Sequence, residues 1–86
     1  MREDKIGEIT HFFGKPMVAA IKITGEGLKV GDTIHIKGKV HDFSQVIESM
    51  QIEHQTIAEA KPGDSIGIKV KEKVKEGDVV FKVLPD

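Results

Sequence analysis

The sequence predicts an all-β fold, a small closed antiparallel barrel of about six or seven strands. A corner of the form Lys-x-Gly-Asp occurs three times, at 29–32, 61–64 and 75–78, and each corner precedes a short run of alternating apolar and polar residues. Glycine adopts backbone angles that other residues resist, and aspartate bonds to its own turn. The residues expected in this turn role are Gly31, Asp32, Gly63, Asp64, Gly77 and Asp78. Closure of the sheet into a barrel is expected because it removes exposed strand edges.

The first two strands are expected at Lys5–Phe13 and within residues 17–23. Ile6 and Ile9 fall out of phase with a simple alternation, and a bulge near Gly7 would turn both of them inward. In the second strand the alternation assigns four residues to the inside: Met17, Ala19, Ile21 and Ile23.

The later strands follow the three corners and the stretches between them. Ile34 and Ile36 would point inward after the first corner, and residues 66 and 68 would do so after the second. Two further strands are expected around Lys39–Ser44 and Val46–Glu53, with Phe43 and Met50 in the core. The only helical signal is a short turn at Thr56–Ala60. No linker is apparent, so residues 1–86 are expected to form one domain, with its core at about 5–83.

The composition excludes several classes of site. The chain has no cysteine, so it offers no disulfide, thiolate zinc site or thiol nucleophile. No apolar run approaches the ~20 residues of a membrane span, and the charged start is unlike a signal peptide, so a cytoplasmic location is expected. The chain has 13 basic and 14 acidic residues and therefore no overall basic excess, so any RNA contact would need a local basic patch. The absence of asparagine, with lysine and glutamate dominating the charges, is typical of heat-resistant proteins.

The order of these segments is similar to the second domain of elongation factor Tu and other translational GTPases. Residues 14–38 resemble the opening of that domain, residues 48–68 its middle and residues 75–80 its close, so that the resemblance runs from about Lys5 to Val83. It implies a closed antiparallel Greek-key barrel. The small stand-alone family called translation elongation factor-like protein fits this pattern. A related barrel ends a family of collagenase-like peptidases.

Some functional positions of the elongation factor domain are different here. Pro16 replaces a glycine of the first turn, Ile21 a small residue, and Glu53 an aromatic residue that shapes the aminoacyl pocket. A pocket for the aminoacyl end of tRNA is therefore not expected. The sequence has no G-x-x-x-x-G-K-[S/T] motif, so it has no GTP site of that kind.

One candidate binding surface is a run of lysines at a period of two: Lys69, Lys71, Lys73 and Lys75. In an extended strand these side chains would form a basic stripe that could follow a phosphate backbone. Alternatively, they protect an exposed strand edge from pairing with another chain. The second interpretation is favoured because Glu72 and Glu76 dilute the charge.

A second candidate surface is formed by Phe12, Phe13 and Lys15 at the first turn. An exposed aromatic pair beside a lysine could stack on a base or on a partner side chain. Alternation instead favours burial of one of the two phenylalanines, because aromatic residues are scarce and the core needs them.

No catalytic, metal or cofactor site is expected. The four histidines, His11, His35, His41 and His54, show no metal-ligand spacing, and no serine lies in a nucleophile-elbow motif. The aspartates of the corners have a local role in their turns.

Two functions remain open for a non-enzymatic binding module. The resemblance favours an accessory module that docks on the ribosome, on tRNA or on a translation factor. The alternative is a protein–protein interaction subunit that supplies in trans the barrel of the collagenase-like peptidases, which the near-neutral charge fits equally well. Sensitivity of the association to salt and RNase would separate them. A small-molecule or metal binder is a weaker third hypothesis.

Overall fold

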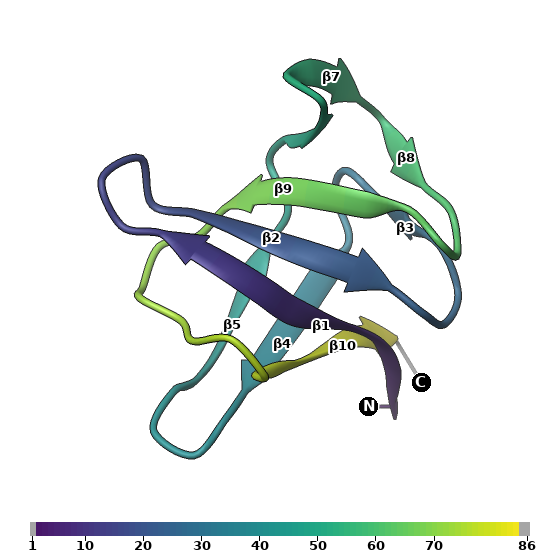
Figure 1. Cartoon of the computed structure of the whole chain (residues 1–86). Coiled ribbons are helices and arrows are strands. Elements are labelled where there is room, and N and C mark those ends of the chain that lie inside the picture. Colours follow the sequence, from purple (N-terminus) through teal and green to yellow (C-terminus); the bar gives the residue numbers. More distant parts are fainter. Residues whose placement is uncertain (1, 85–86) are drawn as a thin grey trace.

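The computed structural model describes residues 2–84, and within this range the chain consists of strands, turns and bends (Figure 1). The strands are β1 (Arg2–Phe13), β2 (Val18–Ile23), β3 (Leu28–Lys29), β4 (Thr33–Lys37), β5 (Asp42–Val46), β6 (Met50–Ile52), β7 (Gln55–Ile57), β8 (Glu59–Ala60), β9 (Ser65–Lys69) and β10 (Val79–Leu84). Over these residues no helix has the length and apolar character to cross a membrane.

Eight of the strands form one antiparallel sheet in the order β5-β4-β10-β1-β2-β9-β6-β7, and β3 pairs separately with β8. The all-β prediction is therefore confirmed. Closure into a barrel is not confirmed, because β5 and β7 form the two ends of this sheet and are not paired with each other. Residues 2–84 contain ten strands in place of the expected six or seven, because several pairings involve only two or three residues.

The core consists mainly of isoleucine side chains that alternate along the strands. The predicted inward residues of β2, β4 and β9 are all buried: Ala19, Ile21, Ile23, Ile34, Ile36, Ile66 and Ile68. Phe43 and Met50 are buried as predicted. Met17 is different, because it lies in the turn before β2 with a φ of 55° and is only partly buried.

The predicted bulge near Gly7 is present in β1. The register with β10 shifts between Lys5 and Gly7, which allows Ile6 and Ile9 both to face the core. A Cβ atom at position 7 would collide with the carbonyl oxygen of Lys22 on β2, so the close approach of the two strands requires glycine here.

The three corners have the same local structure. Their glycines, Gly31, Gly63 and Gly77, have φ angles of 98°, 94° and 92°. In each corner the aspartate Oδ2 accepts a hydrogen bond from the backbone N–H of the first lysine, at 2.8 Å for Asp32, 2.9 Å for Asp64 and 3.0 Å for Asp78. The left-handed glycine and the aspartate thus form one repeated turn, as the sequence predicted.

The predicted helical turn at Thr56–Ala60 is wrong. Residues 55–57 are β7, which returns along β6 after a turn at Glu53 and His54, and both turn residues have positive φ, 49° and 67°. Residues 59 and 60 are β8. The strands expected at 39–44 and 46–53 are also displaced, because a turn at residues 38–41 delays β5 and β6 contains only three residues.

Candidate functional site

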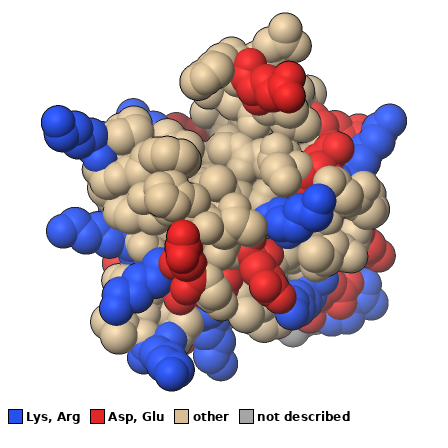
Figure 2. All heavy atoms as spheres, viewed as in Figure 1, with Lys and Arg blue, Asp and Glu red and all other residues tan. Residues whose placement is uncertain are grey.

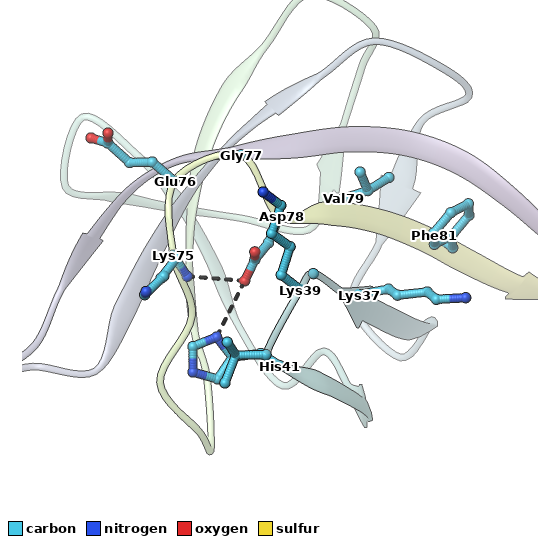
Figure 3. A pocket seen from close by; sticks show the side chains of 11 residues that line it. Lys37, Lys39, His41, Lys75, Glu76, Gly77, Asp78, Val79 and Phe81 are labelled. Carbon is cyan, nitrogen blue, oxygen red and sulfur yellow. Dashed lines mark hydrogen bonds and ion pairs between the residues drawn. The ribbon is translucent and has the colours of Figure 1, made fainter.

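A groove of about 590 Å³ lies between the β4–β5 turn and the third corner, immediately before β10 (Figure 3). Val79 and Phe81, which alternate with the buried Val80 along β10, form its apolar floor. Val40, at the tip of the β4–β5 turn, adds an apolar side chain that is 75% exposed. The groove therefore combines residues from two segments that are almost 40 positions apart in the chain.

Asp78 joins the two walls of the groove, which are the β4–β5 turn and the third corner. It is only 6% exposed, and its Oδ2 atom accepts the Lys75 N–H and lies 3.6 Å from Nδ1 of His41. That histidine nitrogen is buried and makes no hydrogen bond within the described chain. A Cβ atom at Gly38 would collide with the same carboxylate, so a glycine is needed where the β4–β5 turn packs against the corner.

Three lysines lie around the groove, namely Lys37, Lys39 and Lys75. Within residues 2–84 none of them forms an ion pair. The neighbouring carboxylates have other partners: Asp42 contacts His35, and Glu76 lies 3.3 Å from His11. Figure 3 shows Glu76 directed away from Asp78 and His41.

Lysine and arginine side chains also gather in the surface view. Figure 2 shows them at the left and lower left, where Figure 1 places the β4–β5 turn and the loop before β10. Acidic side chains lie beside them in the lower centre of this face. A cationic region therefore exists locally on a chain whose net charge is −1.

Beside the groove, His35 on β4 connects two further strands. Its Nδ1 atom lies 3.0 Å from Glu3 on β1, and its Nε2 atom contacts Asp42 on β5. The ring lies 6.2 Å from that of Phe81. Hydrogen bonds to Asp42 and then to Glu3 raise the pKa of His35 above its usual value, because both carboxylates favour the imidazolium form.

The predicted lysine stripe is not formed in one strand. β9 ends at Lys69, and the following loop is fixed to the core by the buried side chains of Val70 and Val74. Lys75 lines the groove described above, whereas Lys69 and Lys71 line a second one of about 420 Å³. Lys73 is exposed in the loop between them.

Gln45 crosses the second groove from β5, an end strand of the sheet. Its Nε2 atom donates to the carbonyl of Lys69 at 2.8 Å, and its Oε1 atom accepts the N–H of Lys71 at 3.0 Å. The side-chain amide thus replaces a backbone amide in joining β5 to the end of β9.

At the first turn, the structure separates the two phenylalanines. Phe12 packs against the core, whereas Phe13 is 49% exposed and meets His11 edge-on at 4.4 Å between ring centroids. Lys15 is exposed in the turn itself. Of the three residues predicted at this turn, Phe13 and Lys15 are therefore the exposed ones.

Sequence reasoning did not find the residues of the first groove other than Lys75 and its corner. Lys37 and Lys39 flank the essential Gly38, and this Lys-Gly-Lys pattern before a histidine was the only local signal. Nothing in the sequence showed that this turn packs against the third corner. Across residues 2–84 no group of three or more histidines and carboxylates is arranged to hold a metal ion.

The chain is similar to proteases in comparisons with known proteins. It is 41% identical over 81 residues to an uncharacterized protease of Methanocaldococcus jannaschii, covering 93% of this chain and 20% of that protein. It is 33% identical over 78 residues to a collagenase of Porphyromonas gingivalis, covering 90% of this chain and 22% of that protein. The chain spans about a fifth of the length of these curated relatives. No protein-family model matches it.

Solved structures show the same fold. The C-terminal domain of a U32 peptidase from Geobacillus thermoleovorans superposes with a TM-score of 0.86 at 20% identity, over 94% of this chain and 93% of that one. GDP-bound aIF5B from Aeropyrum pernix gives a TM-score of 0.67 at 14% identity, over 95% of this chain and 15% of that one.

These comparisons show that the identification as a translation elongation factor-like protein is wrong. Elongation factor 1-alpha of Pyrobaculum calidifontis matches at 36% identity over 79% of the chain, which is less in both respects than the Methanocaldococcus protease. The translation and RNA-binding assignments are withdrawn with it. The three corners that contribute to the resemblance serve the fold, and a shared fold does not determine a function.

Proposed function

We propose that this chain is a non-catalytic interaction module of a collagenase-like peptidase system. The observation behind the proposal is the match of almost the whole chain to about a fifth of two proteases, together with superposition on an isolated U32 peptidase C-terminal domain. In this role the domain docks on a peptidase body, either as a separate subunit or within a longer chain.

The local chemistry supports binding rather than catalysis. The three corner aspartates each accept a hydrogen bond from a backbone amide. Other carboxylates are paired with histidines, as in Glu3 and Asp42 with His35. We propose that the domain docks as a closed barrel, in which the side chain of Gln45 joins the end strand β5 to the C-terminal end of β9.

Affinity isolation from the native lysate tests this function. The tagged chain is recovered with and without RNase, washed at low and high salt, and its partners are identified by mass spectrometry. We expect a collagenase-like peptidase in stoichiometric amount that resists both treatments. Light scattering of the purified pair should then give a complex of defined composition.

A mock isolation with an unrelated β-domain of similar size and charge controls for adhesion to the resin. Association with ribosomal proteins or tRNA that disappears on RNase treatment would contradict the proposal. Peptide hydrolysis by the isolated chain would also contradict it, since the module is proposed to lack catalytic residues.

A further inference from the structure

We propose that the groove between the β4–β5 turn and the third corner binds an acidic peptide segment that contains an apolar residue. The three lysines would pair with carboxylates, and the floor of Val79 and Phe81 would receive the apolar side chain. This goes beyond docking on a peptidase body, because it assigns a ligand class to one groove of the chain itself.

The charge of the groove favours an anionic ligand. Lys37 and Lys39 flank Gly38 on one wall and Lys75 lies on the other, and within the described chain none of the three is neutralised by an ion pair. The buried carboxylate of Asp78 is held by its own turn and faces His41. A ligand with two or more carboxylates can therefore engage the lysines without displacing an existing pair.

The apolar floor distinguishes a peptide from a nucleic acid. Phe81 is only partly exposed and is flanked by the ring of His35, so it does not offer the open aromatic face on which a base would stack. Val79 and the exposed Val40 provide aliphatic contact, which suits a side chain such as leucine. The lysines surround a short groove and do not form a line that could follow a phosphate backbone.

Both walls are held by contacts within the chain. The turn containing Gly38 packs directly on the Asp78 carboxylate, and the corner is held by the Lys75 N–H bond and by the left-handed Gly77. Preorganised walls reduce the entropy lost on binding.

Fluorescence polarisation with the purified chain tests the assignment. The probe is a fluorescein-labelled peptide in which glutamates flank a leucine–phenylalanine pair. Two comparison probes carry glutamine in place of glutamate, or serine in place of the apolar pair. We expect binding to the first probe that weakens by roughly tenfold or more in a Lys37→Gln/Lys39→Gln/Lys75→Gln variant, since three partly screened ion pairs are lost.

The matched control is Arg2→Gln/Lys29→Gln/Lys61→Gln, which removes the same charge outside the groove. Lys29 and Lys61 open the other two corners as Lys75 opens the third. This variant should change the affinity by no more than about twofold, because distant charges are screened by salt. Thermal melts of both variants confirm that each is folded, and the NMR shifts of Gly38 and Gly77 report the site directly.

Three results would overturn the assignment. They are no binding of the acidic probe, equal losses in the two triple variants, or equal affinity for the serine probe. Binding of a single-stranded oligouridine with the same lysine dependence would instead identify a nucleic-acid groove. Because no peptidase is present in the assay, its outcome is separate from that of the docking experiment.

Discussion

At the scale of single residues, the structure uses its polar side chains mainly to hold separate segments together. His35 is 32 positions from Glu3 in the chain, yet it bridges this residue on β1 and Asp42 on β5 across the two strands between them. Both ring nitrogens face carboxylates, so the doubly protonated ring satisfies both contacts. The bridge therefore depends on pH.

His35 should make the protein more stable in acid relative to a variant that lacks the two carboxylates, Glu3→Gln/Asp42→Asn. The folded-state pKa of His35 is raised above its ordinary value of 6.5, so the folded protein binds the proton more tightly than the unfolded chain does. The resulting stabilisation is fully present below the ordinary pKa and is lost as the pH rises through the raised pKa. Urea denaturation of both proteins at about pH 5.5 and about pH 9 measures the difference.

An NMR titration of His35 in both proteins is the accompanying control, and its pKa should be lower in the variant. A stability difference that is independent of pH, or that is larger at alkaline pH, would contradict the proposed bridge.

At the scale of elements, the three corners depend on residues that are adjacent in the sequence, whereas the contact of the end strand β5 joins residues that are far apart in the sequence. Each corner is determined by four consecutive residues, so its turn could be predicted from a local motif such as residues 61–64. The end strand β5 instead makes contact with β9 through Gln45, which is 24 positions before Lys69 and 26 before Lys71. Such a contact has no local signal.

Replacing Gln45 with leucine should destabilise the domain by about 1–2 kcal/mol, because two hydrogen bonds are lost and a carbonyl and an N–H lose their partner. Urea denaturation measures the change. Gln51→Leu is the matched control on β6, since Gln51 is exposed and its side chain makes no hydrogen bond within the described chain. It should change the stability by less than about 0.5 kcal/mol. Equal effects would show that Gln45 does not join the strands.

The same distinction between local and long-range contacts explains how much of the fold and of the candidate site could be predicted from the sequence. Alternation placed Ile21, Ile34 and Ile66 in the core correctly, and the phase break in β1 correctly indicated its bulge. The groove was missed because Lys37 and Lys75 are brought together only by the packing of a turn against a corner. The segment at 56–60 ends in alanine and glutamate, which favour a helix, but pairing with β6 and β3 places it in strands β7 and β8.

At the scale of the whole molecule, the first and last strands lie side by side. β10 pairs along its whole length with the first half of β1, and Arg2 faces Leu84. β10 also pairs with β4, so it lies inside the sheet rather than at an end (Figure 1). The sheet is therefore incomplete until a strand near residue 80 has joined one near residue 5, a pairing of high sequence separation that slows folding.

A circular permutant tests whether the sheet built on the β1–β10 pairing still folds when the chain begins at another place. Joining Leu84 to Arg2 by a short glycine–serine linker, and opening the chain in the β1–β2 turn between Gly14 and Lys15, keeps every strand intact. We expect a cooperative unfolding transition within about 2 kcal/mol of the parent protein, because exposed turns tolerate new termini and short linkers alter closure entropy little. Circular dichroism and urea denaturation provide the measurement.

The matched permutant opens instead between Ile6 and Gly7, which divides β1 at its bulge and separates the half that pairs with β2 from the half that pairs mainly with β10. It should lose cooperative unfolding, because Ile6 is fully buried and new charged termini would be placed beside it. If both permutants fold equally well, the continuity of β1 is not what holds the centre of the sheet, and the β4–β10 ladder must provide that support instead.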